Sequence, residues 1–227
     1  MSSVELLERR IYAMPDVDRY LGLHSGTARR WIDGYSRKQR EYPPVIRAER
    51  TGDETVSWGE FVEARLLSEF RGRGVSLQKL RPAIENLRAE MHTPYPLAAS
   101  RALLDVAGRD LLMRIQEGIG LDRRLALVVV RSGQMQLSEP AQHFVDRASF
   151  DQGWVSSIAG DSEGTVLIDP LRAMGRPAVR SVPTEVLPEG FRAGESTDAL
   201  ADLYDLTTCQ VERAIRFEMR QASASAA

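Results

Sequence analysis

Arginine is the residue type whose number and placement point to chemistry in this sequence. From residue 19 to residue 50, eight basic residues occur against three acidic ones, a net charge of +5. A guanidinium group is a planar fork of hydrogen-bond donors that fits a phosphate or the O6/N7 edge of guanine. From residue 184 to residue 221, four bases occur against eight acids, a net charge of −4. This asymmetry predicts an anion-binding N-terminal region and a C-terminal region that phosphate would repel.

Residues that usually build metal or catalytic sites are few and scattered. The three histidines, His24, His92 and His143, have no ligand spacing, and the single cysteine, Cys209, excludes an internal disulfide. The sequence contains neither a dinucleotide-binding glycine motif nor a phosphate loop. We therefore expect no metal, no cofactor and no enzymatic activity.

Two short helices around a glycine-containing turn are expected to carry the N-terminal arginines. Residues 14–23 have apolar side chains at helical spacing, and Gly22 ends this first helix. Ser25 is the expected N-cap of the second helix, residues 25–34, whose Trp31 we place in the core. Such a pair is a helix-turn-helix, whose second helix enters the major groove of DNA.

A basic loop and a β-hairpin are expected to follow this helix pair. Val45–Arg47 and Thr55–Val56 are predicted strands around a turn at residues 51–53. A hairpin directly after a helix-turn-helix is typical of a wing.

Two further helices are expected before residue 93. Ser57 and Glu60 have the spacing of a capping box and begin a helix. Leu77–Met91 is an amphipathic segment, which either supplies a dimer interface or packs onto its own domain. Pro82 must kink this second helix or mark its true start.

The remaining chain is predicted to hold a small sheet followed by three helices. The expected strands are Leu111–Ile115, Leu125–Val130, Met135–Leu137, Trp154–Ile158 and Val166–Ile168, with a helix over 138–147. The expected C-terminal helices cover Thr184–Phe191, a segment capped by Ser196, and a last one capped by Thr207 or Thr208.

These elements predict an α+β protein that is mostly α. It would comprise a winged helix-turn-helix domain with following helices (1–93), a central α/β segment with a small β-sheet (94–170), a C-terminal three-helix domain resembling a helix-turn-helix (171–221) and a disordered tail (222–227). No apolar run approaches the roughly 20 residues that span a bilayer. The start of the chain also lacks the apolar core of a secretory signal, so we expect a cytoplasmic protein.

Two segments resemble known families. Leu21-Gly22 and Arg29-Arg30-Trp31 resemble the MerR-type helix-turn-helix, although Asp18 stands where that family usually has a small residue. Gly175-Arg176-Pro177, Pro183-Thr184, Gly194-Glu195-Ser196 and Tyr204-Asp205-Leu206 through Val211 resemble a small helical domain common in VapB-type antitoxins. The usual glycine turn before Pro183 is replaced here by Ser181-Val182.

The resemblance implies an antitoxin that represses its own operon, as a homodimer on operator DNA, and neutralises a PIN-domain ribonuclease toxin encoded beside it. A second hypothesis is a ligand-responsive MerR-like transcriptional regulator with an effector pocket in the central sheet. A third is a purely structural interaction protein, which predicts no salt-dependent DNA binding.

The expected DNA-binding residues lie on the second helix, the basic loop and the wing: Ser25, Thr27, Arg29, Arg30, Arg37, Lys38, Arg40, Arg47 and Arg50. Arg29 and Arg30 could bind guanine or phosphate. The expected partner-binding residues are Arg213, Arg216 and Arg220, which share one face of the last helix. This basic stripe could enter the acidic metal site of a nuclease, or pair with Glu212, Asp202 or Glu218 of its own chain.

Overall fold

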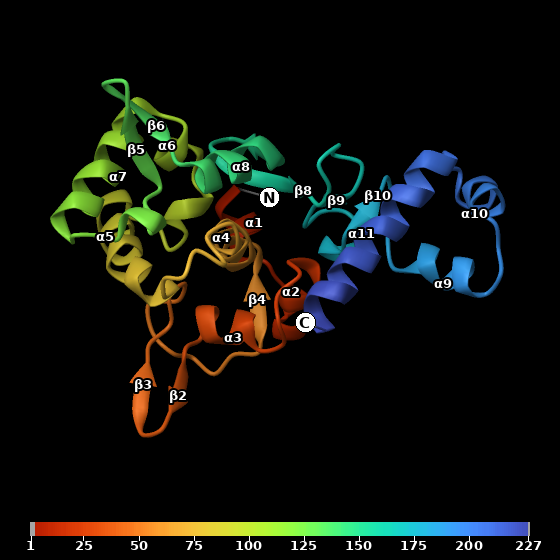
Figure 1. Cartoon of the computed structure of the whole chain (residues 1–227), viewed down its shortest axis with the longest axis horizontal. Helices are drawn as coiled ribbons and strands as arrows, with labels where there is room; N and C mark the ends of the chain where they lie inside the picture. The colour runs from red at the N-terminus through yellow and green to blue at the C-terminus, as the bar shows by residue number, and fades with distance from the viewer. Residues whose placement is uncertain (1–2, 227) are drawn as a thin grey trace.

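The computed structural model describes residues 3–226 and shows a mixed helical protein with small antiparallel sheets (Figure 1). The N-terminal part contains α1 (Ser3–Glu8), β1 (Arg10–Ala13), α2 (Met14–Tyr20), α3 (Thr27–Ile32), β2 (Tyr35–Arg37), β3 (Arg40–Tyr42), β4 (Thr55–Ser57), α4 (Trp58–Ser68) and α5 (Arg81–Met91). Helices α2 and α3 are the expected helix-turn-helix pair. The following hairpin, β2–β3, projects from the rest of the molecule (Figure 1).

The expected hairpin between Val45–Arg47 and Thr55–Val56 is wrong. Strand β4 pairs with β1 instead, with Tyr12 opposite Val56. The backbone N–H groups of Val45 and Ile46 donate to the carbonyl of Trp31, and that of Arg47 donates to the carbonyl of Ile32. These N–H groups satisfy carbonyls at the C-terminal end of α3, so residues 45–47 do not pair with a strand.

The middle of the chain contains more helix than its apolar runs indicated. It comprises α6 (Ser100–Leu103), α7 (Val106–Gly118), β5 (Val128–Arg131), β6 (Gln134–Leu137), α8 (Glu139–Arg147), β7 (Ala148–Asp151), β8 (Trp154–Ala159) and β9 (Leu167–Ile168). The predicted strand Leu111–Ile115 lies inside α7. Its buried residues Leu112, Ile115 and Gln116 are spaced by three and four, which is the period of a helix face and not of a strand.

The C-terminal part contains β10 (Ala178–Val179), β11 (Val182–Pro183), α9 (Val186–Arg192), α10 (Thr197–Tyr204) and α11 (Thr208–Ala226). Strands β10 and β11 complete a five-stranded antiparallel sheet in the order β11-β10-β9-β8-β7. Because α11 continues to Ala226, the expected disordered tail is helical over 222–226, and residue 227 lies outside the described residues.

Most of the expected capping signals were confirmed. The Ser57 side chain accepts a hydrogen bond from the N–H of Glu60, whose carboxylate accepts one from the N–H of Ser57. Pro82 lies in the first turn of α5, after a short 3₁₀ helix (Leu77–Leu80), and so marks the true start of that helix. Ser196 caps α10, and Thr207 caps α11 by accepting from the N–H of Gln210.

Two apolar cores hold the chain together. The larger core extends from Leu7 to Ile168, so residues on both sides of the expected boundary near residue 93 pack into it. The fully buried indole of Trp58 in α4 donates to the carbonyl of Val155 in β8 at 2.8 Å. The second core joins α9, α10 and α11 to Val166 and Val179 of the sheet.

Candidate nucleic-acid interface

The start of α3 is held by a carboxylate from α2 and not by the expected Ser25. Asp18 accepts hydrogen bonds from the N–H of Gly26 and the N–H of Ala28, both at 2.7 Å. Gly26 is the N-cap residue and has a φ of 77°, a backbone conformation that suits glycine. Burial raises the pKa of Asp18, although these N–H donors act in the opposite direction. Asp18 therefore fixes the angle between the two helices.

The exposed arginines of α3 are each positioned by a neighbour. Arg29 forms an ion pair with Glu54, which precedes β4, and its side chain remains 46% exposed. Arg30 donates to the hydroxyl of Thr27 at 2.8 Å. Ser25 is exposed in the turn, whereas Thr27 is buried and orients Arg30. Two guanidinium groups thus stand on the solvent face of a helix that the protein holds rigidly.

The hairpin β2–β3 presents three of the expected phosphate-binding residues. Arg37, Lys38 and Arg40 are all exposed at its tip. Lys38 and Gln39 form the two-residue loop with φ angles of 48° and 60°, the conformation of the primed turns that match strand twist. Tyr35 and Tyr42 stack at 4.5 Å between ring centroids and rigidify the base of the hairpin.

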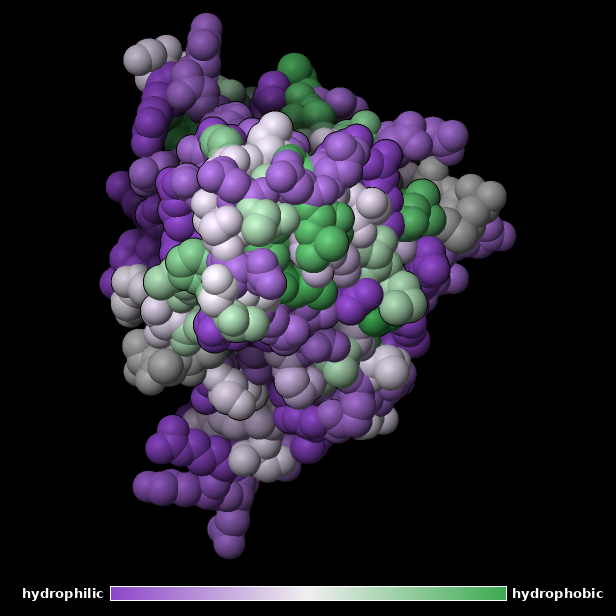
Figure 2. All heavy atoms as spheres, turned by 90° about the vertical axis from the view of Figure 1, so that its right-hand side faces the viewer, coloured by the Kyte–Doolittle hydropathy of each residue, from purple (hydrophilic) through white to green (hydrophobic). Residues whose placement is uncertain are grey.

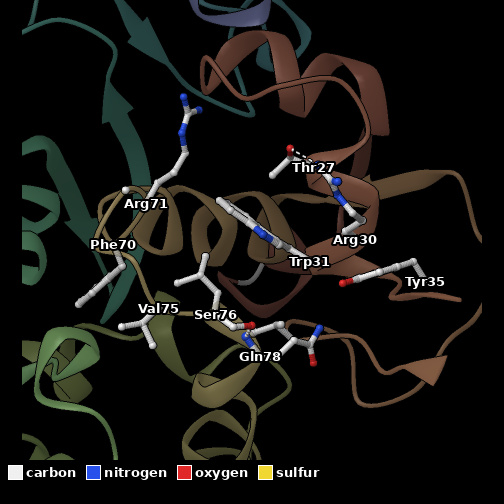
Figure 3. A pocket seen from close by; sticks show the side chains of 12 residues that line it. Thr27, Arg30, Trp31, Tyr35, Phe70, Arg71, Val75, Ser76 and Gln78 are labelled. Carbon is white, nitrogen blue, oxygen red and sulfur yellow. Dashed lines mark hydrogen bonds between the residues drawn. The ribbon is translucent and has the colours of Figure 1, made fainter. Parts of the chain in front are cut away.

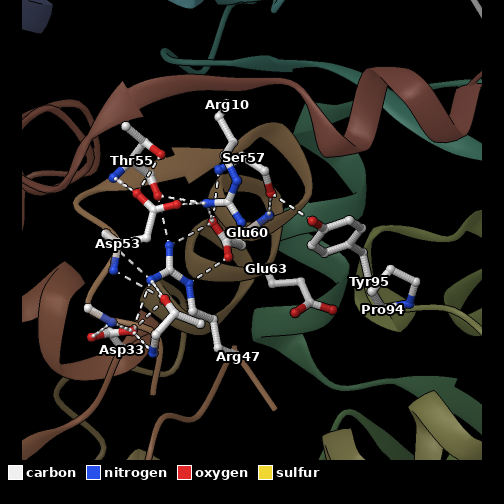
Figure 4. Close-up of polar contacts among 12 residues, drawn as sticks. Arg10, Asp33, Arg47, Asp53, Thr55, Ser57, Glu60, Glu63, Pro94 and Tyr95 are labelled. Atoms are coloured by element: carbon white, nitrogen blue, oxygen red, sulfur yellow. Dashed lines mark hydrogen bonds and ion pairs between the residues drawn. The ribbon is translucent and has the colours of Figure 1, made fainter. Parts of the chain in front are cut away.

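Arg47 cannot serve as the wing residue that the sequence suggested, because its side chain is only 5% exposed (Figure 4). Its guanidinium donates to Asp33 at 2.9 Å and to Glu60 at 2.7 Å, and also to the carbonyls of Asp53 and Thr55. The hydrogen bonds from Arg47 and from the N–H groups of residues 51 and 52 lower the pKa of Asp33 against its burial. Arg47 therefore stabilises the fold through these buried contacts and is not available to a ligand.

Arg50 remains accessible, with 56% of its side chain exposed. It lies 3.9 Å from Asp33 and 3.8 Å from Glu41, and it donates to the hydroxyl of Ser36 at 3.3 Å. These contacts place Arg50 beside the base of the β2–β3 hairpin, so it stays a candidate for phosphate contact.

Sequence reasoning missed the acidic residues that organise this surface. Asp18 is separated from its two N–H partners by eight and ten residues, and its one sequence signal was the departure from the MerR-type pattern. Glu54 is 25 residues from Arg29, and nothing in the sequence connects the two.

The three arginines of α11 line one cavity of about 380 Å³, together with Asp161, Ser162, Glu163 and Met219. Arg213 donates to the hydroxyl of Thr165 at 2.7 Å, and Arg216 pairs with Glu212 at 2.7 Å, one of the pairings expected. A hydrogen bond from Ser162 lowers the pKa of Glu163, and Arg213 and Arg220 add to this effect. The basic stripe therefore faces two nearby carboxylates.

The C-terminal helices contact the helix-turn-helix directly. Helix α11 packs against α2. Glu185, next to α9, accepts from Arg19 of α2 at 2.9 Å and from Arg176 at 2.8 Å. These two arginines lower the pKa of Glu185 against its partial burial.

The two ends of the molecule differ in surface character. Figure 2 shows hydrophilic residues at the lower tip, where the β2–β3 hairpin lies, and apolar residues among polar ones on the facing C-terminal helices. The exposed apolar side chains of the C-terminal helices include Phe191 of α9, Leu203 of α10 and Met219 of α11. Patches of this kind are typical of protein-binding surfaces.

Comparison with known proteins agrees with this geometry. Residues 10–84 match a family model described as a putative DNA-binding HTH domain. Uncharacterized protein Rv2308 of Mycobacterium tuberculosis is 35% identical, over 96% of this chain and 93% of its own. Putative antitoxin VapB45 of the same organism is 31% identical, over 90% of this chain and 92% of its own. The chain belongs to the family of these two mycobacterial proteins.

A solved structure extends this family relationship to the fold. The crystal structure of Rv2018 from Mycobacterium tuberculosis superposes with a TM-score of 0.75 at 27% identity, and covers 92% of this chain and 99% of that one. The two chains therefore share their fold over most of their length. Among residues 3–226, no helix is both long enough and apolar enough to cross a membrane.

Proposed function

We propose that this chain is a non-enzymatic antitoxin of a type II toxin–antitoxin system, which represses its own operon and neutralises a PIN-domain ribonuclease. The observation that carries the DNA-binding part is the pair of exposed guanidinium groups on α3, which the basic β2–β3 hairpin follows directly in the chain. The relative named putative antitoxin VapB45 supports the antitoxin part.

In this proposal the N-terminal region is a MerR-like winged helix-turn-helix. Helix α3 enters the major groove, where Arg29 and Arg30 reach base edges or phosphates. The β2–β3 hairpin is the wing, and its Arg37, Lys38 and Arg40 contact the phosphate backbone. A two-fold homodimer would read two operator half-sites, since such modules usually bind in pairs.

The C-terminal helices are the proposed toxin-binding part. The region from residue 184 to residue 221 has a net charge of −4, which disfavours phosphate, and it exposes Phe191 and Leu203. Arg213, Arg216 and Arg220 are the proposed contacts to the acidic metal site of the nuclease. Exposed apolar side chains and a net negative charge suit a protein partner better than DNA.

The first experiment measures binding to the DNA upstream of the gene by fluorescence anisotropy over a salt series. Five phosphate contacts per protomer predict a slope of log K against log salt of about −4 to −5. The Arg29→Ala/Arg30→Ala variant should lose its preference for this DNA over unrelated DNA. Arg192→Ala, at an exposed arginine of α9, is the matched control and should bind like the wild type. Equal affinity of the native protein for both DNAs at low salt would refute the repressor.

The second experiment co-expresses the chain with the adjacent PIN-domain protein and measures RNA cleavage. The native chain should suppress cleavage, and Arg213→Ala/Arg220→Ala should suppress it less than Arg192→Ala does. If the native chain binds its operator but leaves RNA cleavage by the PIN-domain protein unchanged, the antitoxin part of the proposal is refuted and the DNA-binding part stands. The ligand-responsive regulator would then become the working hypothesis, tested by small molecules that raise the melting temperature.

A further inference from the structure

A cavity of about 280 Å³ lies beside α3, on the flank that carries Arg30 (Figure 3). Its walls come from α3, from the start of the β2–β3 hairpin and from the segment that follows α4. Trp31 and Tyr35 contribute aromatic side chains to its lining. The segment after α4 contributes Arg71 and Gln78. The cavity therefore adjoins the surface proposed to meet DNA and is distinct from the hairpin tip.

The charge of this cavity points to an anionic ligand. Its lining contains Arg30 and Arg71 and includes no carboxylate. The opposite flank of α3 differs, because Glu54 there neutralises Arg29. Other arginine-lined cavities also contain acids, such as Glu163 in the cavity beside α11 and Glu60 in a cavity that includes Arg47. Among these three cavities, the one on the Arg30 flank is lined by arginines without a carboxylate.

Arg71 is held in a position from which it can reach DNA. Its Nη1 donates to the carbonyl of Gly22, in the turn between α2 and α3, at 2.6 Å. This bond anchors one edge of an exposed guanidinium group beside the helix-turn-helix turn. The guanidinium has five donors, and this hydrogen bond occupies one of them.

We infer that this cavity binds the phosphodiester backbone of one DNA strand, with a phosphate between Arg30 and Arg71. The inference rests on the proposed DNA binding and adds a contact on the side of α3 away from Glu54. The aromatic faces of Trp31 and Tyr35 suit the apolar side of a deoxyribose, and Gln78 lies at the rim. Helix α3 would then be held to the backbone by the hairpin and by Arg71.

The test measures DNA binding of Arg71→Ala over a salt series, on operator and on unrelated DNA. Loss of one phosphate contact should lower the magnitude of the salt slope by about 0.9. Arg71→Ala should lose the same factor in affinity on both DNAs, because a phosphate contact carries no sequence information. Arg73→Ala is the matched control, since Arg73 lies two residues away and points to Glu139 at 3.3 Å. Its slope should equal that of the wild type.

A second measurement separates a lost contact from a loosened fold. Operator duplexes carry a neutral methylphosphonate at one position at a time, and each is bound by the wild type and by Arg71→Ala. At one position the methylphosphonate should weaken binding by the wild type and leave binding by Arg71→Ala unchanged, because that variant already lacks the contact. Arg71→Lys, which keeps the charge, should regain most of the slope.

Three outcomes would overturn the inference. If the wild type and Arg71→Ala have the same steep salt slope, the proposed function stands and only the Arg71 contact is refuted. Absence of any coupled position in the methylphosphonate series would do the same. A native protein that does not bind DNA at low salt would remove the proposed function and the contact together.

Discussion

The carboxylate of Asp18 in α2 accepts a hydrogen bond from the backbone N–H of Ala28 in α3 at 2.7 Å. A side chain in the first helix of the pair thus performs the capping that is usually local to the second helix. The position at which the sequence departs from the MerR-type pattern is therefore the one that fixes the orientation of α3.

Replacing Asp18 should loosen α3 and weaken DNA binding. Asp18→Ala leaves two N–H groups without their acceptor and should lower the free energy of unfolding by about 1–2 kcal/mol. Asp18→Asn keeps one acceptor oxygen and should lie between this variant and the wild type. Urea unfolding and operator binding measure the two effects. Wild-type stability in Asp18→Ala would show that the cap is dispensable.

Arg47 should matter for stability and not for phosphate binding. Arg47→Ala leaves Asp33 and Glu60 buried without their cation and should cost about 3–5 kcal/mol in the free energy of unfolding. Arg50→Ala, at an exposed neighbour, should cost about 0–1 kcal/mol. Chemical denaturation of both variants checks this contrast. Wild-type stability with reduced DNA affinity in Arg47→Ala would restore the wing interpretation.

Glu63 should make the protein less stable as the pH rises. Its side chain in α4 is fully buried, its Oε1 accepts from the N–H of Leu97 at 3.1 Å, and its Oε2 lies 3.8 Å from Arg88. Burial raises the pKa of Glu63 from 4.5 to about 8, against the effect of Arg88. Between these values the unfolded chain releases a proton that the folded chain keeps. The free energy of unfolding therefore falls over this interval.

Glu63→Gln tests this dependence by removing the titrating proton at nearly constant shape. The variant should gain stability relative to the wild type between pH 5 and pH 8, by a few kcal/mol on the order expected for such a shift. Glu85→Gln, at a more exposed carboxylate of α5, should show no such gain. Melting curves at four or five pH values would decide, and parallel curves for Glu63→Gln and the wild type would contradict the prediction.

Glu54 should sharpen the DNA preference of Arg29. Glu54→Gln removes the ion pair that orients Arg29 and also removes a negative charge from the proposed DNA face. Affinity for unrelated DNA should rise, while the ratio of operator to unrelated affinity should fall about tenfold, within the range for one bidentate base contact. Anisotropy titrations on both DNAs measure this ratio. A ratio equal to that of the wild type would mean that Arg29 binds phosphate.

The sequence by itself determined features whose partners lie within a few residues. The capping box of Ser57 and Glu60 and the cap Ser196 were predicted correctly, and the start of α5 at Pro82 and the cap Thr207 were each one of two predicted alternatives. Each depends on backbone donors one turn away, so the local sequence contains all the participants. The helix-turn-helix followed from apolar spacing and the glycine turn, whereas its expected cap, Ser25, was wrong because the acceptor is Asp18 of the preceding helix.

Only the tertiary structure decided which residues meet across long separations. Strand β4 pairs with β1, more than 40 residues upstream, and the backbone donors of residues 45–47 bond to the end of α3 instead of to a strand. Arg47 is buried with Asp33 and Glu60 paired to its guanidinium, while a short basic hairpin, β2–β3, directly follows α3. A basic residue carries the same charge whether it is buried, like Arg47, or exposed on a hairpin. Its burial and its partners decide whether that charge stabilises the fold or faces a ligand.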